Sequence, residues 1–202
     1  MRVIRNSALA CALVLALLSF AGIPTRAEDH FLTIGGGYSP AGNQVSLERN
    51  VVFFKKLLAE GFPGGVRHDV FFADGDSPHR DLQYHIEGDE SVPRANRLMA
   101  GLFGSEEDLE NHYRDNTLEG VRGPSSPSEL ERWFEETGAT LRAGDRLILY
   151  VTAHGGKSGQ KDNKFNTKIW MWDRQFVDAA KLSALIGGLP EGVDVVTVMV
   201  QC

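Results

Sequence analysis

Four short apolar runs recur along the chain, and segments with helical spacing separate most of them. Each run is too short for a helix and is rich in strand-forming residues. The runs are HFLTIGGGY (30–38), DVFFAD (69–74), LILYVT (147–152) and a final run from Asp194 to Val200. Strands that are apolar on both faces are typical of parallel sheets covered by helices, so the pattern predicts an α/β fold. We expect a three-layer α/β/α sandwich with a mainly parallel sheet.

Three helices are expected between these runs. The apolar residues from Leu47 to Glu60 recur at helical spacing, and Gly61 follows them. A second helix begins after Ser126, because Ser-Pro-Ser-Glu offers an N-cap hydroxyl, a proline at the first position and a glutamate three residues later. We expect it to end near Gly138. A further strand, KIWMWD (168–173), precedes a third helix from about Gln175 to Ile186.

The stretch from Gly75 to Ser126 is different, because it is rich in Gly, Pro, Asp and Arg and has no sustained period. We interpret it as an irregular insertion, at about residues 75–126, with one short helix around Glu106 to Tyr113. No internal repeat or low-complexity tract is present. The remainder of the chain is long enough for one domain with a substantial core, which we expect to span residues 28–202.

Residues 1–27 have the pattern of a secretory signal peptide. A basic start with Arg2 and Arg5 precedes an apolar centre, Pro24 and small residues up to Ala27. We expect cleavage after Ala27, which predicts a secreted or periplasmic protein that meets the membrane only during export. The alternative, a retained anchor, requires about 20 apolar residues, and the apolar centre has about 16.

Charge and cysteine content narrow the possible functions. The chain has a formal net charge of −6, and loss of Arg2, Arg5 and Arg26 with the signal peptide lowers it to about −9. An acidic surface argues against nucleic acid as a partner. Loss of Cys11 leaves Cys202 as the single cysteine, which cannot form an internal disulfide. It is either a buried apolar cysteine or a chemically active thiol.

Working residues of parallel sheets lie just beyond the carboxyl ends of strands. His154 follows the run LILYVT by two residues and precedes Gly155 and Gly156, while Cys202 follows the final apolar run. A neutral imidazole beside a thiol can accept its proton and so create the reactive thiolate. The spacing of 48 positions from His154 to Cys202 leaves room for one strand, one helix and a return strand. We therefore expect the last strand to neighbour the 147–152 run. A structural hydrogen bond is the alternative role for His154.

LILYVTAHGG followed by VVTVMVQC resembles the two motif blocks of the caspase-like clan of cysteine peptidases. The legumain-type family, which includes asparaginyl endopeptidases and the glycosylphosphatidylinositol transamidase subunit, is most similar. That family has an Asn after the first strand and an acidic residue five positions later, as Asn43 and Glu48 stand here. The resemblance covers about residues 30–74 and 145–202. It implies a caspase-like fold in which Asn43 orients His154.

The resemblance also implies an activity, that of a secreted cysteine endopeptidase or transpeptidase acting on peptides or proteins without a metal or organic cofactor. The backbone N–H groups of Gly155 and Cys202 would hold the oxyanion. The family has a basic residue two positions after its Asn, and this chain has Val45 there, which leaves the side-chain preference open. Gln44, Val45 and Ser46 are the candidate substrate-binding residues.

The family continues beyond its Cys, so the resemblance implies a domain that is incomplete at its C-terminus. The alternative function is a catalytically inactive caspase-like binding protein or an inactive fragment.

The sequence motifs that would indicate other functions are weaker. Gly35, Gly36 and Gly37 do not complete a nucleotide-binding pattern, and Asp74-Gly75-Asp76 lacks the further ligands of a calcium loop. The remaining histidines have no paired spacing typical of zinc ligands.

Overall fold

The computed structural model describes residues 27–200. The expected signal peptide, apart from Ala27, and the candidate nucleophile Cys202 lie outside the described residues. No helix in the described range is long and apolar enough to cross a membrane.

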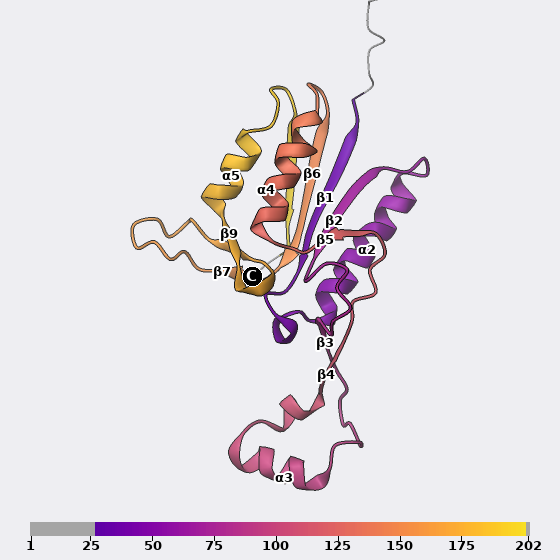
Figure 1. Cartoon of the computed structure of the whole chain (residues 1–202), viewed down its shortest axis with the longest axis vertical. Helices are drawn as coiled ribbons and strands as arrows, with labels where there is room; N and C mark the ends of the chain where they lie inside the picture. Colours follow the sequence, from indigo (N-terminus) through magenta and orange to yellow (C-terminus); the bar gives the residue numbers. More distant parts are fainter. Residues whose placement is uncertain (1–26, 201–202) are drawn as a thin grey trace, which may run out of the picture.

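The centre of the molecule is a five-stranded sheet in the order β10-β6-β1-β2-β5, and every neighbouring pair of strands is parallel (Figure 1). Its strands are β1 (Asp29–Gly36), β2 (Arg67–Phe72), β5 (Val121–Gly123), β6 (Arg146–Ala153) and β10 (Asp194–Met199). The prediction of a parallel sheet is confirmed, and so is the pairing of the last strand with the strand that precedes His154.

Helices cover both faces of this sheet, so the molecule is an α/β sandwich (Figure 1). α2 (Val45–Gly61) packs on one face, and α4 (Pro127–Glu136) and α5 (Ala179–Gly187) pack on the other. An apolar cluster lies on each face of the sheet, and β2 contributes to both, because successive residues of a strand point to opposite faces: Phe71 belongs to one cluster, Val70 and Phe72 to the other. Leu32 and Ile34 of β1 belong to the cluster under α4 and α5, which includes the fully buried Trp133.

Side-chain caps define the starts of α4 and α5, and the predicted start agrees with the structure for α4 alone. The Ser126 side chain accepts a hydrogen bond from the Glu129 N–H at 3.3 Å, which confirms the predicted start of α4. α5 begins at Ala179, later than expected, because Asp178 caps it through the Lys181 N–H at 2.8 Å. Short 3-10 turns follow β1 and α4; they are η1 (Pro40–Gly42) and η3 (Gly138–Thr140).

The strand order reverses between β1 and β6. From β1 the chain proceeds outward through β2 to β5, and it then returns to β6 on the other side of β1 and ends at β10. In open α/β sheets this reversal leaves a crevice at the carboxyl ends of the two central strands, where ligands bind. The segment after β1 and the segment after β6 therefore define where to look for a site.

The segment between β2 and α4 is more ordered than the sequence predicts. β3 (Leu82–His85) and β4 (Asn111–Arg114) form an antiparallel pair, and α3 (Arg94–Phe103) lies beyond them. The helix expected around Glu106 to Tyr113 is wrong, since a 3-10 turn, η2 (Glu106–Glu110), precedes β4 there. We call the segment from β3 to β4 (residues 82–114) the arm. The arm extends away from the sheet (Figure 1), and none of the residues of α3 is buried.

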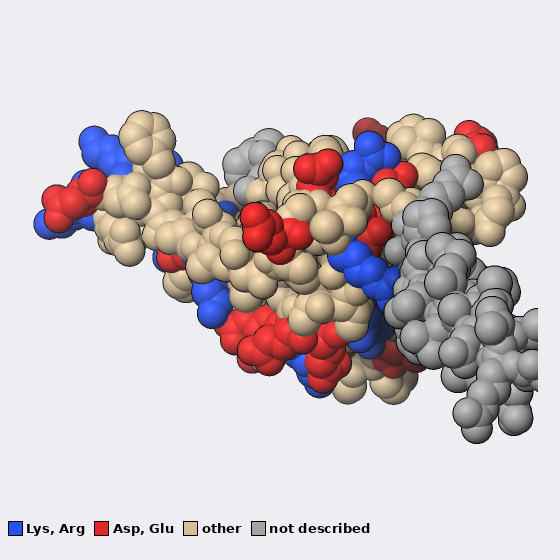
Figure 2. Space-filling model, turned by 90° about the horizontal axis from the view of Figure 1, so that it is seen from above, with Lys and Arg blue, Asp and Glu red and all other residues tan. Residues whose placement is uncertain are grey.

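A second small sheet follows β6. It consists of β7 (Gly155–Gly156), β8 (Lys168–Trp170) and β9 (Phe176–Asp178), all antiparallel, with the turn η4 (Trp172–Arg174) between the last two. The strand that begins at Lys168 therefore ends at Trp170, earlier than the predicted end at Asp173. The loop between β7 and β8 projects from one side of the molecule, and Figure 2 shows basic and acidic side chains near its tip.

The buried Glu48 ties the arm to α2. Its carboxylate accepts hydrogen bonds from the Arg114 guanidinium (3.0 Å) and from the Thr117 N–H (2.7 Å). Burial by itself raises the pKa of Glu48, but these hydrogen bonds and the charge of Arg114 outweigh it and hold the pKa below the ordinary value of 4.5. The charged form is therefore the one that the fold stabilises.

We expect Glu48→Gln to lower the free energy of unfolding by about 1–3 kcal/mol at pH 7, because charged hydrogen bonds to a buried group are lost. A lowered pKa in the folded state stabilises above the ordinary pKa, so the difference from the wild type should shrink as the pH falls below 4.5. Urea unfolding at several pH values measures it. Glu60→Gln, on the same helix but exposed beside Lys56, is the control and should change little. Equal stability of Glu48→Gln and wild type at pH 7 would contradict this account.

Candidate active site at the carboxyl ends of β1 and β6

His154 stands directly after β6, at the edge of the sheet where the strand order reverses. Its ring atom Nε2 lies 2.8 Å from the Gly42 carbonyl oxygen and 2.9 Å from Oε1 of Gln44. Both partners come from the segment that joins β1 to α2. The imidazole is therefore held by the two central strands together, and it is only partly buried.

The contact with Gly42 determines the tautomer of His154. A backbone carbonyl can only accept a hydrogen bond, so Nε2 must carry the proton in both the neutral and the charged ring. In the neutral ring Nδ1 then has the free lone pair. Within residues 27–200 no hydrogen bond to Nδ1 is formed. The ring is thus set up to accept a proton at Nδ1 while Nε2 stays anchored.

Glycines allow the loop after β1 to turn back sharply enough to present the Gly42 carbonyl. A Cβ on Gly37 would overlap with the Gly42 carbonyl oxygen, and a Cβ on Gly42 would lie 2.8 Å from the Tyr38 ring. Gly36 has a φ of 94°, a conformation that strongly favours glycine. The glycine run thus serves close backbone packing beside His154.

Asn43 is fully buried, and it holds this loop rather than the histidine. Its Oδ1 accepts a hydrogen bond from the Gly37 N–H at 3.0 Å, and its Nδ2 donates to the Asp81 carbonyl at 2.9 Å. No hydrogen bond joins its side chain to His154, although both residues are described. The direct contact with the ring, which the resemblance assigns to Asn43, is made by the carbonyl of the preceding residue, Gly42.

The three candidate substrate-binding residues have different surroundings. Gln44 contacts the His154 ring through its side-chain oxygen. Val45 packs against the apolar cluster that includes Leu47 and Val51, so its side chain belongs to the core beneath α2. Ser46 is exposed at the start of the same helix. The structure brings Gln44 to the histidine and does not gather all three around one cavity.

Asp81, whose carbonyl accepts the hydrogen bond from Asn43, is a second buried polar residue beside the site. Asp81 is fully buried and accepts hydrogen bonds from the Asn116 N–H at 2.8 Å and from the Asn116 side chain at 3.2 Å. Burial, followed by the charge of Asp81, raises the pKa of the nearby Asp74 to about 6. Asp74 leaves one carboxylate oxygen, Oδ1, buried with no hydrogen-bond partner among the described residues. The folded protein therefore binds the proton of Asp74 more tightly than the unfolded chain does.

The backbone after His154 leaves one N–H group available. The Trp170 N–H donates to the His154 carbonyl at 2.8 Å, and Gly155 stands opposite Ile169 in the antiparallel pair of β7 and β8. In such pairs hydrogen-bonded and non-bonded positions alternate, so Gly155 and Ile169 form a non-bonded pair. The Gly155 N–H therefore points away from β8. This is consistent with its expected role as an oxyanion donor.

A cavity of about 250 Å³ is lined by Tyr38, Trp170 and Arg174. The Tyr38 ring lies against the His154 ring, with centroids 5.6 Å apart, and against Trp170 at 6.1 Å. Sequence patterns do not reveal this group, because neither Tyr38 nor Arg174 stands in a recognisable motif. Arg174 is brought to Tyr38, and so to the neighbourhood of His154, by a backbone hydrogen bond from the Arg174 N–H to the Tyr38 carbonyl at 3.0 Å.

The turn that presents Arg174 is conformationally strained. Asp173 and Arg174 both have a φ of 56°, in the left-handed region that residues other than glycine rarely adopt. Each such residue costs about 1–3 kcal/mol and persists only where its surroundings impose it. The Trp172 N–H, bonded to the Ser125 carbonyl at 2.8 Å, fixes the other end of the turn. Strain of this kind is concentrated at functional sites.

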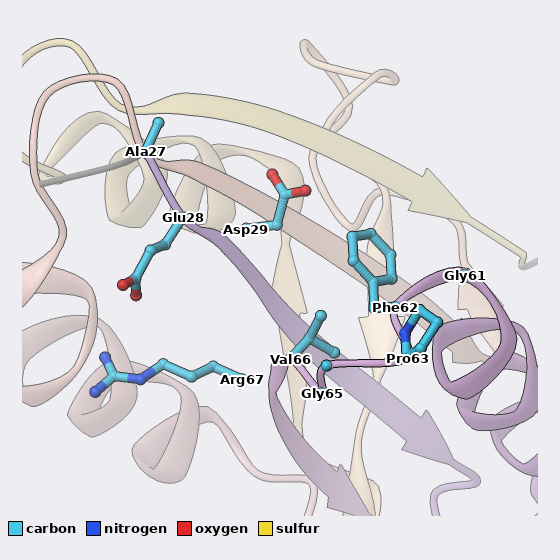
Figure 3. Close-up of a pocket in the computed structure, with 10 residues that line it drawn as sticks. Ala27, Glu28, Asp29, Gly61, Phe62, Pro63, Gly65, Val66 and Arg67 are labelled. Atoms are coloured by element: carbon cyan, nitrogen blue, oxygen red, sulfur yellow. The ribbon is translucent and has the colours of Figure 1, made fainter.

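A larger cavity lies elsewhere in the described part of the chain. It has a volume of about 810 Å³ and lies at the amino ends of β1 and β2, the opposite edge of the sheet from His154 (Figure 3). Residues 27–29 and 61–67 line it. Size alone is therefore a poor guide to the site in this protein. Within the described range, no group of three or more His, Cys, Asp or Glu side chains is placed to hold a metal ion.

No protein-family model matches the chain, and no curated protein matches it significantly. Its likeness to the caspase-like peptidases therefore rests on the residues around His154, Asn43 and Cys202.

We expect Gly37→Ala to displace the Gly42 carbonyl and so to release the His154 ring from a single tautomer, because the added methyl overlaps with that carbonyl. Nitrogen NMR of the ring, assigned with His154→Ala, should show the Nε2–H form alone in the neutral wild-type ring and a mixture in the variant. Gly64→Ala is the control, since a Cβ there meets no atom within 4 Å. A wild-type ring protonated at Nδ1 would refute the assignment.

Asp74 should make the stability of the protein depend on pH. Its pKa is raised from 3.8 to about 6, so the folded state binds the proton more tightly and loses stability as the pH rises between these values. We expect Asp74→Asn, which carries no charge, to become increasingly more stable than the wild type over this range. The difference should level off above pH 6. Asp76→Asn, exposed two residues further on, is the matched control. A difference that stays constant with pH would contradict the burial argument.

Proposed function

We propose that the protein is a cysteine peptidase of the Cys–His type, in which Cys202 is the nucleophile and His154 the general base. The observation that supports this most is the anchoring of His154 Nε2 by the Gly42 carbonyl, because it leaves Nδ1 as the proton acceptor. The substrate class is a peptide or protein. The resemblance to caspase-like peptidases gives the chemistry, and the strand order of the sheet is compatible with it.

The pairing of β6 with β10 supports the partnership of His154 and Cys202. Met199 stands opposite Val151 in a parallel register, and the Val200 N–H donates to the Val151 carbonyl at 2.8 Å. His154 follows Val151 by three residues, and Cys202 follows Met199 by three. Two chains that leave neighbouring parallel strands at the same level can place side chains within reach of each other. We propose that the imidazole and the thiol meet in this way.

The proposed reaction begins with proton transfer from the Cys202 thiol to Nδ1 of His154. The thiolate attacks the peptide carbonyl carbon, and the oxyanion that forms accepts hydrogen bonds from the N–H groups of Gly155 and Cys202. As the C–N bond breaks, the imidazolium returns its proton to the leaving amine, and a thioester remains. Water then adds to the thioester, which releases the acid and restores the thiol; another amine in place of water gives transpeptidation.

The proposed location, secreted or periplasmic, depends on the basic and apolar pattern of residues 1–27. A single thiol in an oxidising compartment is compatible with a catalytic cysteine that has no partner for a disulfide.

We expect iodoacetamide to label Cys202 at pH 7 at least about tenfold faster than an ordinary thiol, of which only a few per cent is thiolate at that pH. Mass spectrometry of the peptide that contains Cys202 measures the rate and excludes any signal from Cys11. His154→Ala should remove the excess rate, and His85→Ala, on the arm, should not. The same preparation should cleave fluorogenic peptides, and Cys202→Ser should not.

Ordinary reactivity of Cys202, unchanged by His154→Ala, would refute the peptidase proposal and favour an inactive binding protein or fragment. Fast labelling without cleavage of any peptide would support activation of Cys202 by His154 but would contradict peptide hydrolysis as the activity.

A further inference from the structure

The cavity formed by Tyr38, Trp170 and Arg174 lies on one particular side of His154. In the sheet, β6 stands between β10 and β1, and Tyr38 follows β1. The Tyr38 ring contacts the His154 ring, and the Arg174 N–H is bonded to the Tyr38 carbonyl. The cavity is therefore on the β1 side of the imidazole, across from the strand that leads to Cys202. The role inferred for this cavity rests on the proposed function.

In a Cys–His peptidase, the side of the imidazole away from the sulfur belongs to the leaving group. The sulfur bonds to the carbonyl carbon, and the imidazolium gives its proton to the amine nitrogen as that bond breaks. The residue that carries this amine must extend beyond the ring. A cavity beside Tyr38 is thus placed to receive the residue that follows the scissile bond.

Arg174 gives this cavity a positive charge without a counter-charge. Among residues 27–200, no carboxylate oxygen lies within 4.0 Å of its guanidinium, and its side chain forms no hydrogen bond. Of the ten other arginines of this range, half form ion pairs with Asp or Glu, namely Arg97, Arg114, Arg122, Arg132 and Arg146. A guanidinium presents parallel N–H donors in the geometry that a carboxylate accepts.

The rest of the lining fits an anionic group of modest size. The Trp170 indole N–H and the Tyr38 hydroxyl form no hydrogen bonds within the described range, so donors outnumber acceptors around the cavity. Lys168 lies nearby, with its Nζ 4.0 Å from the Phe176 ring and 5.7 Å from the Trp170 ring, and adds positive potential. A volume of about 250 Å³ is below the range of sites for whole drug-sized ligands, and it suits one side chain or chain end.

We propose that this cavity binds a carboxylate on the leaving-group side of the scissile bond, and that Arg174 is the residue that determines this specificity. The carboxylate belongs either to an Asp or Glu that directly follows the bond or to the free C-terminus of a residue in that position. Both sources present the same planar anion to the guanidinium. The strained turn at Asp173 and Arg174 holds the Arg174 backbone beside Tyr38, so that this residue lines the cavity.

Cleavage of matched peptide pairs tests the proposal in the full-length protein. One pair differs only in Asp against Asn after the scissile bond, and a second pair differs in a free C-terminal carboxylate against a carboxamide. We expect kcat/KM to favour the acid about 10- to 100-fold in at least one pair, which identifies the source of the carboxylate. Because the readout is a ratio within one preparation, a loss of folded protein or of overall activity does not affect it.

In Arg174→Gln the ratio of kcat/KM for the acidic peptide to kcat/KM for its neutral match should fall to about one. Arg174→Lys keeps the positive charge but loses the parallel N–H donors of the guanidinium, so its ratio should be intermediate. Arg94→Gln, an exposed arginine at the start of α3 on the arm, is the control and should keep the wild-type ratio. A wild-type ratio near one in both pairs, or a ratio that survives Arg174→Gln, would overturn the proposal.

A binding measurement separates failure of this proposal from failure of the proposed peptidase activity. With Cys202→Ala, calorimetric titration of the same peptides reports the preference without any reaction. If no peptide is cleaved by the wild type, the peptidase proposal fails. The preference for the acid in the titration, and its loss when Arg174→Gln is added, still decides whether the cavity binds a carboxylate.

Discussion

The hydrogen bond between His154 Nε2 and the Gly42 carbonyl is the contact on which the candidate site depends. It joins the ends of the two central strands, and it decides which ring nitrogen can take a proton. A side-chain acceptor could rotate away or titrate, whereas the backbone carbonyl of the buried Gly42 can do neither. The imidazole thus has one fixed nitrogen and one available nitrogen, which is the requirement for a general base.

The fixed position of that carbonyl is itself a consequence of packing in the loop after β1. A Cβ on Gly37 would overlap with the Gly42 carbonyl, a Cβ on Gly42 would press on the Tyr38 ring, and the buried Asn43 amide bridges the two ends of the turn. Asn43 in turn reaches the Asp81 carbonyl at the base of the arm. The arm is therefore part of the support of the site, because it supplies the polar groups that satisfy a fully buried amide.

Several features of the fold and site could be predicted from the sequence because they depend on local patterns. Apolar runs of strand length indicated the parallel sheet, and the Ser126 cap indicated the start of α4. The arm was missed, since β3 and β4 are short, partly exposed strands with weak periodicity. The exposed helix α3 was also missed, although it is amphipathic, because the Gly, Pro and Arg around it suggested irregular structure.

Within the site, sequence patterns located His154 and Asn43 but not what they touch. The role expected of the Asn43 side chain is performed by a neighbouring backbone atom, which no residue pattern encodes. Tyr38 and Arg174 come together through a backbone hydrogen bond between segments more than a hundred residues apart. The left-handed conformation of Asp173 and Arg174 is imposed by those tertiary bonds rather than by residues that prefer it.

Net charge describes the whole chain and says little about the charge around its site. The protein is acidic, with a formal net charge of −6, and several of its described acidic side chains are held in ion pairs. Near His154, Arg174 lines a cavity with two aromatic residues, Lys168 lies over the Trp170 and Phe176 rings, and no carboxylate of the described residues forms an ion pair with either cation. Charges close to the reacting atoms act across a shorter distance and with less screening than the distant surface. An acidic protein can therefore favour an acidic ligand at this one edge of its sheet.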